Sequence, residues 1–224
     1  MANVRIGIIG SGGMGSRRAD AFSALAGCEV SAIAARNPET GPRLARKHDV
    51  PLVSNWRELV GREDINAVVI CTHNEIHGPI VLQALEAGRH VFTEYPVVRF
   101  LEETDRLSDL IQSSNQVLRV AHSENVSAIH QLLCRQVKDM GELLAAFFQR
   151  LTPGRGSRPE VLFNLNLSGP PALFFVYHVY AMVALFGPAA WVECGASYQG
   201  LNEDTSYHRF VNTVTVGFQG GGIG

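Results

Sequence analysis

The sequence predicts an α/β protein in which a doubly wound parallel sheet is followed by a smaller α+β region. Three observations lead to this fold class. A short apolar run enters a glycine-rich turn at the start of the chain, strand and helix patterns then alternate to residue 121, and the pattern changes after residue 123. Strands that alternate with helices form parallel sheets covered by helices on both faces. We therefore expect one domain over residues 1–122 and a second over residues 123–224.

The glycine-rich turn predicts a dinucleotide site of the Rossmann type. The run Val4–Ile9 leads directly into Gly10-x-Gly12-x-x-Gly15, and a helical pattern follows. Gly10 permits a tight turn, Gly12 lets a pyrophosphate approach the backbone, and Gly15 lets the helix pack closely, with its positive end toward the phosphates. A glycine-rich turn without ligand is the alternative interpretation. The residues expected to contact the cofactor here are Gly10, Ser11, Gly12, Gly13, Met14 and Gly15.

The remaining elements of the first domain follow from hydrophobic periodicity. In the last expected helix, Leu101, Leu107, Leu110 and Ile111 form an apolar stripe between polar positions, as in surface helices. Strands are predicted at Val4–Ile9, Glu29–Ala34, Ala67–Cys71, His90–Thr93 and Val117–Ala121. Helices are predicted at Met14–Leu25, Pro38–Lys47, Ile76–Ala87 and Glu102–Gln112.

The second domain is predicted to be an α+β sheet domain that ends before it is complete. Its two last strands alternate in polarity and are expected to pair antiparallel. The predicted order is a helix Asn125–Val137, a strand Leu143–Arg150, a loop Thr152–Pro159, a helix Leu173–Phe186, and strands Trp191–Tyr198 and Arg209–Phe218.

Composition excludes several classes of partner. A net charge of −2 without a basic run gives no reason to expect nucleic acid or an anionic membrane. The four cysteines are far apart and form no Cys-x-x-Cys, so we expect a reduced, cytoplasmic protein without a structural metal. Residues 161–192 lack Asp, Glu, Lys and Arg, but prolines and glycines shorten the helical part, which favours a buried helix over a membrane span. The first residues do not resemble a signal peptide.

The end of the second predicted strand favours NADP(H) over NAD(H). NAD-binding sites of this fold place an acidic residue about 20 positions beyond the glycines, where it binds the ribose hydroxyls. This chain has Ala34-Ala35-Arg36-Asn37 there, without a carboxylate. Arg36, beside Asn37, is suited to charge-assisted hydrogen bonds with a 2′-phosphate. The alternative is a solvated surface arginine beside a turn.

Two further blocks carry a resemblance to a known family. They are Asn66–Asn74 followed by His77, and Ala84–Gly88 followed by His90-Val91-Phe92-Thr93-Glu94-Tyr95-Pro96. With the glycine turn, they resemble the glucose–fructose oxidoreductase / inositol dehydrogenase / MocA family, in which a Rossmann domain precedes an open-faced α+β domain. The resemblance covers residues 3–121 well and the remainder loosely. It implies cofactor contacts at Cys71, Thr72, His73, His77, Glu94 and Tyr95.

Two departures from the family pattern bear on the substrate. Sugar-oxidising members have Glu-Lys-Pro where this chain has Glu94-Tyr95-Pro96, and their helical His…Asp pair is reduced here to His178 without the aspartate. Sugar oxidation needs a base, and a tyrosine of ordinary pKa (~10) is a poor one at neutral pH. Glu-Tyr-Pro, with His122-Ser123-Glu124, is similar to the biliverdin-reductase branch, the cyanobacterial type most of all. Arginines that this type has on the later helix are absent.

The resemblance implies hydride transfer from NADPH to a bilin, a reaction that needs no strong base. Histidine supplies protons near neutrality, and arginines in the loop before the apolar helix would meet the propionates. The implied catalytic residues are Tyr95, His178, Glu94 and His122. The implied substrate contacts are Tyr95, Glu124, Arg155, Arg158, Tyr177 and His178.

Each assignment has an alternative. Aromatic residues on an apolar helix are often core, a histidine after a strand often bonds backbone, and loop arginines are often solvated. The substrate is a small molecule in either case: a bilin, or a sugar or other carbonyl compound. A cofactor-binding regulatory protein without activity is the third hypothesis. Assembly as a homo-oligomer, such as a dimer, is a further expectation from the family.

Overall fold

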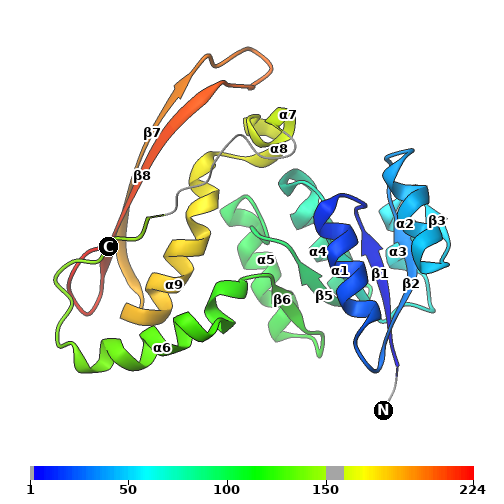
Figure 1. The fold of residues 1–224 in the computed structure, drawn as a ribbon, viewed down its shortest axis with the longest axis horizontal. Helices are drawn as coiled ribbons and strands as arrows, with labels where there is room; N and C mark the ends of the chain where they lie inside the picture. Colours follow the sequence, from blue (N-terminus) through cyan, green and yellow to red (C-terminus); the bar gives the residue numbers. More distant parts are fainter. Residues whose placement is uncertain (1–2, 150–158) are drawn as a thin grey trace. The chain divides into compact units, whose positions relative to one another are not determined.

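The computed structural model describes residues 3–149 and 159–224 of the chain. These residues form two compact units, Met1–Ala121 and His122–Gly224, which we describe separately. The first unit contains a six-stranded parallel sheet with helices, and the second contains helices and a two-stranded antiparallel ribbon (Figure 1).

The sheet of the first unit has the strand order β3-β2-β1-β4-β5-β6. Strand β1 pairs with β2 on one side and with β4 on the other, so the order reverses beside β1. In open parallel sheets, ligands bind outside the carboxyl ends of the strands at such a switch point. The strands are β1 (Val4–Ile9), β2 (Cys28–Ala34), β3 (Leu52–Val53), β4 (Ala67–Ile70), β5 (His90–Thr93) and β6 (Leu118–Val120).

Helices cover this sheet on both faces, as the alternation of strand residues requires. On one face Ile6 and Ile8 of β1 belong to the same apolar cluster as Ala19 and Leu44. The other face is occupied by a second cluster that includes Leu59 of a short helix. The helical elements are α1 (Gly13–Ser23), α2 (Thr40–His48), α3 (Trp56–Gly61), η1 (Asn74–Ile76), α4 (His77–Glu86) and α5 (Leu101–Gln112).

The predicted fold class is confirmed by this arrangement. Strands β1 and β5 begin and end where the sequence indicated, and the other predicted strands and helices of the unit differ by one or two residues at their ends. Strand β3 and helix α3 were not predicted. Strand β3 has two residues and α3 has six, which is too short for a hydrophobic period to develop.

The second unit consists of short helices and a long ribbon. Strands β7 (Ala189–Gln199) and β8 (Arg209–Phe218) pair antiparallel, which confirms the predicted pairing. At one end of the ribbon Val216 and Phe218 are buried against Met182 and Phe186. The helices are η2 (Ser123–Val126), α6 (Ala128–Gln136), η3 (Val137–Asp139), α7 (Pro159–Leu162), α8 (Leu165–Ser168), η4 (Pro171–Phe175) and α9 (Val176–Phe186).

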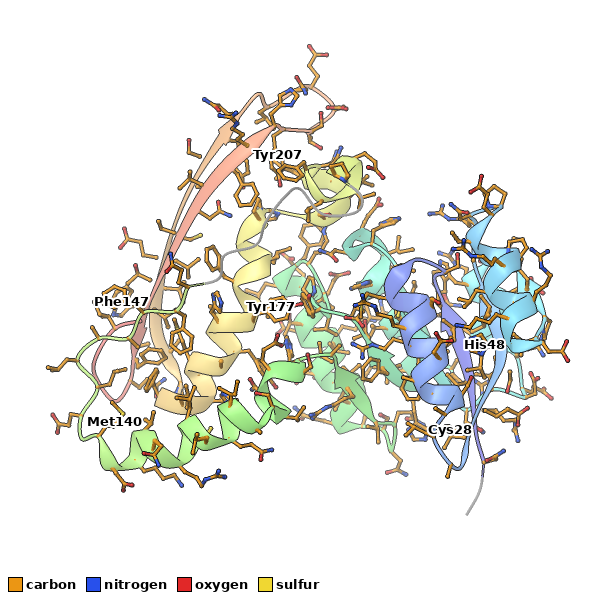
Figure 2. The ribbon with its side chains drawn as sticks, in the orientation of Figure 1. Cys28, His48, Met140, Phe147, Tyr177 and Tyr207 are labelled. Atoms are coloured by element: carbon orange, nitrogen blue, oxygen red, sulfur yellow. The ribbon has the colours of Figure 1, made fainter. Side chains whose placement is uncertain are left out.

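One predicted strand, Leu143–Arg150, is wrong. Over residues 143–149 the chain makes a single bridge, between Ala145 and Ile223, and Ala146 donates its N–H to the Ile223 carbonyl at 2.9 Å. Phe147 is 94% exposed and projects from this segment in Figure 2, whereas Leu143 and Phe148 are partly buried against the apolar cluster of Met182, Val216 and Phe218. The apolar run therefore packs on this cluster without forming a strand of a sheet. Arg150 and the predicted loop, apart from Pro159 at the start of α7, lie outside the described residues.

The apolar stretch before the ribbon forms η4 and α9. Within the described part of the chain, no helix combines the length and the apolarity that a membrane span would need.

An aromatic cluster joins the distal end of the ribbon to the helices α7 and α8. Tyr207 is 3% exposed, and its ring centroid lies 5.4 Å from that of Phe163 and 5.1 Å from that of Tyr198 (Figure 2). The Tyr207 hydroxyl donates to the Leu162 carbonyl at 3.2 Å. Burial of the phenol, with a smaller contribution from Tyr198, raises the pKa of Tyr207 to about 12. The hydroxyl therefore stays protonated and the hydrogen bond persists across the physiological range.

We expect Tyr207→Ala to destabilise the second unit by about 3–5 kcal/mol, because it removes a buried aromatic ring from this cluster. Tyr207→Phe should cost about 1 kcal/mol, the typical worth of one hydrogen bond. Urea unfolding followed by circular dichroism measures both changes. Phe147→Ala, at an exposed position, is the control and should leave the midpoint unchanged. Equal midpoints for Tyr207→Ala and wild type would contradict the assignment of Tyr207 to a core.

Candidate functional site

The turn after β1 is shaped by two glycines that touch other backbone atoms. Gly10 has φ +107°, and a Cβ built on it would lie 2.4 Å from the Cys71 carbonyl oxygen. A Cβ on Gly15 would lie 2.0 Å from the Gly10 carbonyl oxygen. No other residue type fits at either position without displacing the backbone. The sequence predicted close packing by Gly15, and the structure identifies its partner as the turn itself.

Helix α1 begins with exposed backbone donors. Gly12 precedes it in an extended conformation, and within the described residues no side chain caps its first turn and no acidic residue lies there. The N–H groups of a first helical turn lack partners inside the helix, and the helix dipole adds positive potential. This end of α1 is therefore suited to bind a diphosphate.

The loop after β2 is ordered by Asn37. Its side-chain oxygen accepts the N–H groups of Glu39 and Thr40, each at 2.9 Å, which fixes the chain before α2. Arg36 lies just before this turn and is exposed. The hydroxyls of Ser11 and Thr40 are 2.7 Å apart, so the glycine turn is tied to the start of α2.

The loop after β4 lies beside the glycine turn. Burial, reinforced by the negative charge of Glu94, raises the pKa of the Cys71 thiol to about 12, so this thiol is unreactive near neutral pH. The hydroxyl of Thr72 donates to the His73 carbonyl at 3.2 Å. The His73 ring lies 3.5 Å from the carboxylate of Glu75.

Glu94 is held by an arginine that the sequence analysis did not single out. Arg18 of α1 donates from Nε to the Glu94 carboxylate at 2.8 Å and forms an ion pair with it. The guanidinium lies 5.0 Å from the centroid of the Phe92 ring. Glu94 is 8% exposed, and its N–H donates to the Ile70 carbonyl at 3.0 Å. Glu94 is therefore charge-compensated by Arg18 in this structure, and its catalytic and cofactor-binding roles stay predictions.

His77, a predicted cofactor contact, is a deeply buried residue. It is 1% exposed, with Nδ1 at 2.8 Å from the Pro96 carbonyl and Nε2 at 3.2 Å from the Thr72 carbonyl. Burial lowers the pKa of His77, and the two carbonyl oxygens oppose that effect. The ring thus lies between the loops that follow β4 and β5, and its contact with a cofactor stays a prediction.

Tyr95 is half-buried at the carboxyl end of β5, between Glu94 and Pro96 in the sequence. The carboxyl ends of β1, β2, β4 and β5 form one edge of the sheet, because these strands are parallel and adjacent. The structure thus brings the predicted cofactor residues of the first unit to a single edge. Arg18 and Thr40 were missed, although Arg18 stands three residues after Gly15 and shares its helix face.

The candidate residues of the second unit occupy the start of the unit and helix α9. The His122 ring stacks on Tyr180, with centroids 4.1 Å apart and an interplanar angle of 17°. His178 is half-buried, 6.3 Å from Phe175 between ring centroids, and Tyr177 is half-buried on the same helix (Figure 2). The carboxylate of Glu124 accepts the Ser123 hydroxyl at 3.4 Å. Arg155 and Arg158 lie outside the described residues.

The parallel sheet, its reversal beside β1 and the uncapped start of α1 define a nucleotide-binding α/β protein of the Rossmann class. Comparison with known families gives the same class and a particular family. Residues 4–122 match the model of the Gfo/Idh/MocA family, described as an oxidoreductase family with an NAD-binding Rossmann fold. The chain belongs to this family, as its motifs indicated.

Individual relatives differ in substrate. Levoglucosan dehydrogenase of Pseudarthrobacter phenanthrenivorans is 34% identical over 130 residues, which are 54% of this chain and 33% of that protein. A dTDP-3,4-didehydro-2,6-dideoxy-alpha-D-glucose 3-reductase of Streptomyces violaceoruber is 32% identical over 173 residues, 74% of this chain and 49% of that protein. The chain thus spans a third to a half of the length of these relatives.

Solved structures share the fold. Biliverdin reductase from Synechocystis sp. PCC 6803, in complex with biliverdin and NADP+, superimposes with a TM-score of 0.86 at 24% identity, over 98% of this chain and 70% of that one. Levoglucosan dehydrogenase in complex with NADH and levoglucosan superimposes with a TM-score of 0.84 at 24% identity, over 99% and 65%. At these identities the likeness establishes the architecture.

We expect Gly15→Ala to weaken dinucleotide binding by at least about tenfold, or about 1.4 kcal/mol. The added methyl group would displace the Gly10 carbonyl and with it the turn that faces the phosphates. Isothermal titration with NADPH measures the change. Gly61→Ala is the matched control, because the Cβ there meets no heavy atom within 4 Å. Wild-type affinity in Gly15→Ala would exclude this turn from the binding site.

Proposed function

We propose that the protein is an NADPH-dependent oxidoreductase that transfers hydride between the nicotinamide C4 and a planar conjugated or carbonyl substrate. One observation carries this proposal: the uncapped first turn of α1 follows a glycine turn at the point where the sheet order reverses. Membership of an oxidoreductase family supports it. The dinucleotide would supply the hydride, and the residues of the sheet edge would bind and orient it.

The preference for NADP(H) rests on the loop after β2. Arg36 is exposed next to Asn37, whose side-chain oxygen is already used by backbone N–H groups. A guanidinium binds a 2′-phosphate through charge-assisted hydrogen bonds, and positions 34–37 hold no carboxylate, so the residue that binds the ribose hydroxyls in NAD sites is absent there. Relatives do not decide the matter, since the biliverdin reductase structure contains NADP+ and the levoglucosan dehydrogenase structure contains NADH.

A bilin is the substrate that we propose first. Tyr95 takes the place of the lysine that sugar-oxidising relatives use, and Glu94, the residue before it, is compensated by Arg18. Hydride addition to the C10 bridge of a bilin requires a proton at a pyrrole nitrogen and no strong base. In the proposal His178 or His122 supplies that proton, and Tyr95 contributes a flat face and a hydroxyl. Glu124 and Tyr177 are further substrate contacts, and Arg155 and Arg158 would meet the propionates.

A keto sugar is the second candidate, favoured by the names of the curated relatives. One acts on levoglucosan and another is a reductase of a sugar nucleotide. In the direction of reduction, hydride addition leaves an alkoxide that needs a proton, and a neutral tyrosine is a suitable donor. Tyr95 would then be the acid of a ketone reduction.

We expect Arg36→Ala to lower the affinity for NADPH by at least about tenfold, since one charge-assisted phosphate contact is worth about 1.5–3 kcal/mol. The affinity for NADH, which lacks the 2′-phosphate, should stay within about twofold of wild type. Fluorescence titration of both cofactors gives the comparison. Arg46→Ala, an exposed arginine near the other end of α2, is the control. Equal losses for NADPH and NADH would remove Arg36 from the site.

Mixing the purified protein with NADPH and biliverdin tests the bilin proposal. Turnover should decrease the red absorbance of the bilin and increase absorbance in the blue. Tyr95→Phe should slow this turnover by at least about tenfold while cofactor affinity stays within about twofold, because the hydroxyl acts on the substrate. Reduction of keto sugars without bilin turnover would favour the second candidate. NADPH binding without turnover of either substrate class would instead indicate a regulatory protein.

A further inference from the structure

The segment that carries Tyr95 is held from both ends by side chains of other elements. We propose, on the basis of the function proposed above, that Arg18 and His77 are positioning residues that fix Tyr95 where the nicotinamide half of the cofactor binds. Neither residue acts on the substrate in this proposal.

Arg18 holds the segment at Glu94. Its guanidinium is fixed in two directions, by the carboxylate at 2.8 Å and by the face of the Phe92 ring at 5.0 Å. Phe92 in turn meets Phe22 of α1 edge to face, with centroids 5.7 Å apart. A planar guanidinium suits such a site better than an ammonium, because it donates in a fixed plane and stacks on a ring.

The burial of Glu94 makes its carboxylate depend on the charge of Arg18. Glu94 is 8% exposed, so its carboxylate would be left without compensation in a low-dielectric site if Arg18 were removed. The carboxylate would then turn toward water, and Tyr95, the next residue, would move with it. Arg18 lies one helical turn beyond Gly15, so the same helix places the phosphate-facing turn and this support.

His77 holds the segment at Pro96. A neutral imidazole carries one N–H, and we assign it to Nδ1, because that nitrogen makes the shorter contact, 2.8 Å, with the Pro96 carbonyl. The other nitrogen, which then carries a lone pair, lies 3.2 Å from the Thr72 carbonyl in a packing contact and donates nothing to it. Burial lowers the pKa of His77, which favours this neutral form. The ring thus donates to the loop after β5 and packs against the loop after β4, so it fills the space between them.

Ligands that contain one or both halves of the cofactor can distinguish a positioning role from a general loss of structure. The adenosine half would lie at the end of β2 near Arg36, whereas the supported segment follows β5, two strands beyond β1 in the sheet. Loss of a support should therefore weaken NADPH binding and spare the binding of 2′,5′-ADP, which lacks the nicotinamide. A substitution that only unfolds the unit weakens both.

We expect Arg18→Met to lower NADPH affinity by at least about tenfold and to leave 2′,5′-ADP affinity within about twofold, as measured by titration calorimetry. Arg18→Lys, which keeps the charge, should recover part of the loss. Arg17→Met, at the exposed neighbouring position, is the matched control and should bind both ligands as wild type does. Equal weakening of both ligands by Arg18→Met, or of neither, would overturn the proposal for Arg18.

A double variant keeps the test valid if Arg18→Met folds poorly. Arg18→Met with Glu94→Gln removes the buried charge and should recover the unfolding midpoint without recovering NADPH affinity. If both the unfolding midpoint and the NADPH affinity recovered, the effect of Arg18→Met would come from the uncompensated charge alone, which would contradict a positioning role for Arg18. His77→Leu should behave as Arg18→Met does, and His77→Asn, which keeps an N–H donor, should be rescued in part; unchanged NADPH affinity in His77→Leu would exclude His77. Wild-type protein that binds neither ligand would contradict the proposed function itself.

Discussion

The first unit depends on the contact between the start of α1 and the turn that precedes it. Gly15 has no Cβ, so the helix can approach the Gly10 carbonyl more closely than any other residue type would allow. Gly10 in turn lies against the carbonyl of Cys71. Three backbone segments are therefore in direct contact, without side chains between them. This contact determines where α1 begins, and hence where its free N–H groups lie relative to the ends of the parallel strands. The phosphate-binding property of the fold follows from that placement.

Side-chain contacts tie the other loops at this edge of the sheet to one another and to α1. The Ser11 hydroxyl contacts that of Thr40 at the start of α2, and His77 lies between the carbonyls of Thr72 and Pro96. Arg18 links α1 to Glu94. The polar side chains nearest the expected ligand thus satisfy one another, and they leave Arg36 and the first turn of α1 as exposed groups of the described edge. A site built in this way is largely formed before a ligand binds, which reduces the ordering entropy that binding must overcome.

Much of this architecture could be predicted from the sequence. Strands β1 and β5, buried and β-branched, and the glycine spacing before α1 are local signals, and local signals determined the first unit almost completely. The prediction was wrong at Leu143–Arg150, because a short apolar run does not reveal whether a partner strand exists. It was silent on Arg18, whose importance arises from Glu94, a residue 76 positions away. For Glu94 and His77 the motif gave no information on burial and partners, because these are tertiary properties that spacing does not encode.

The ribbon of β7 and β8 is anchored by buried side chains at both of its ends. Phe218 and Val216 are packed at one end and Tyr207 at the other, while most residues between them face solvent on both sides. A two-stranded ribbon resists twisting weakly, so its coiling along the span is imposed by the two anchors and not by packing in the middle. Loss of the packing around Tyr207 would leave the ribbon anchored only at the end that carries Val216 and Phe218. Its free end would then sample a range of twist angles, although every hydrogen bond of the ladder remained intact.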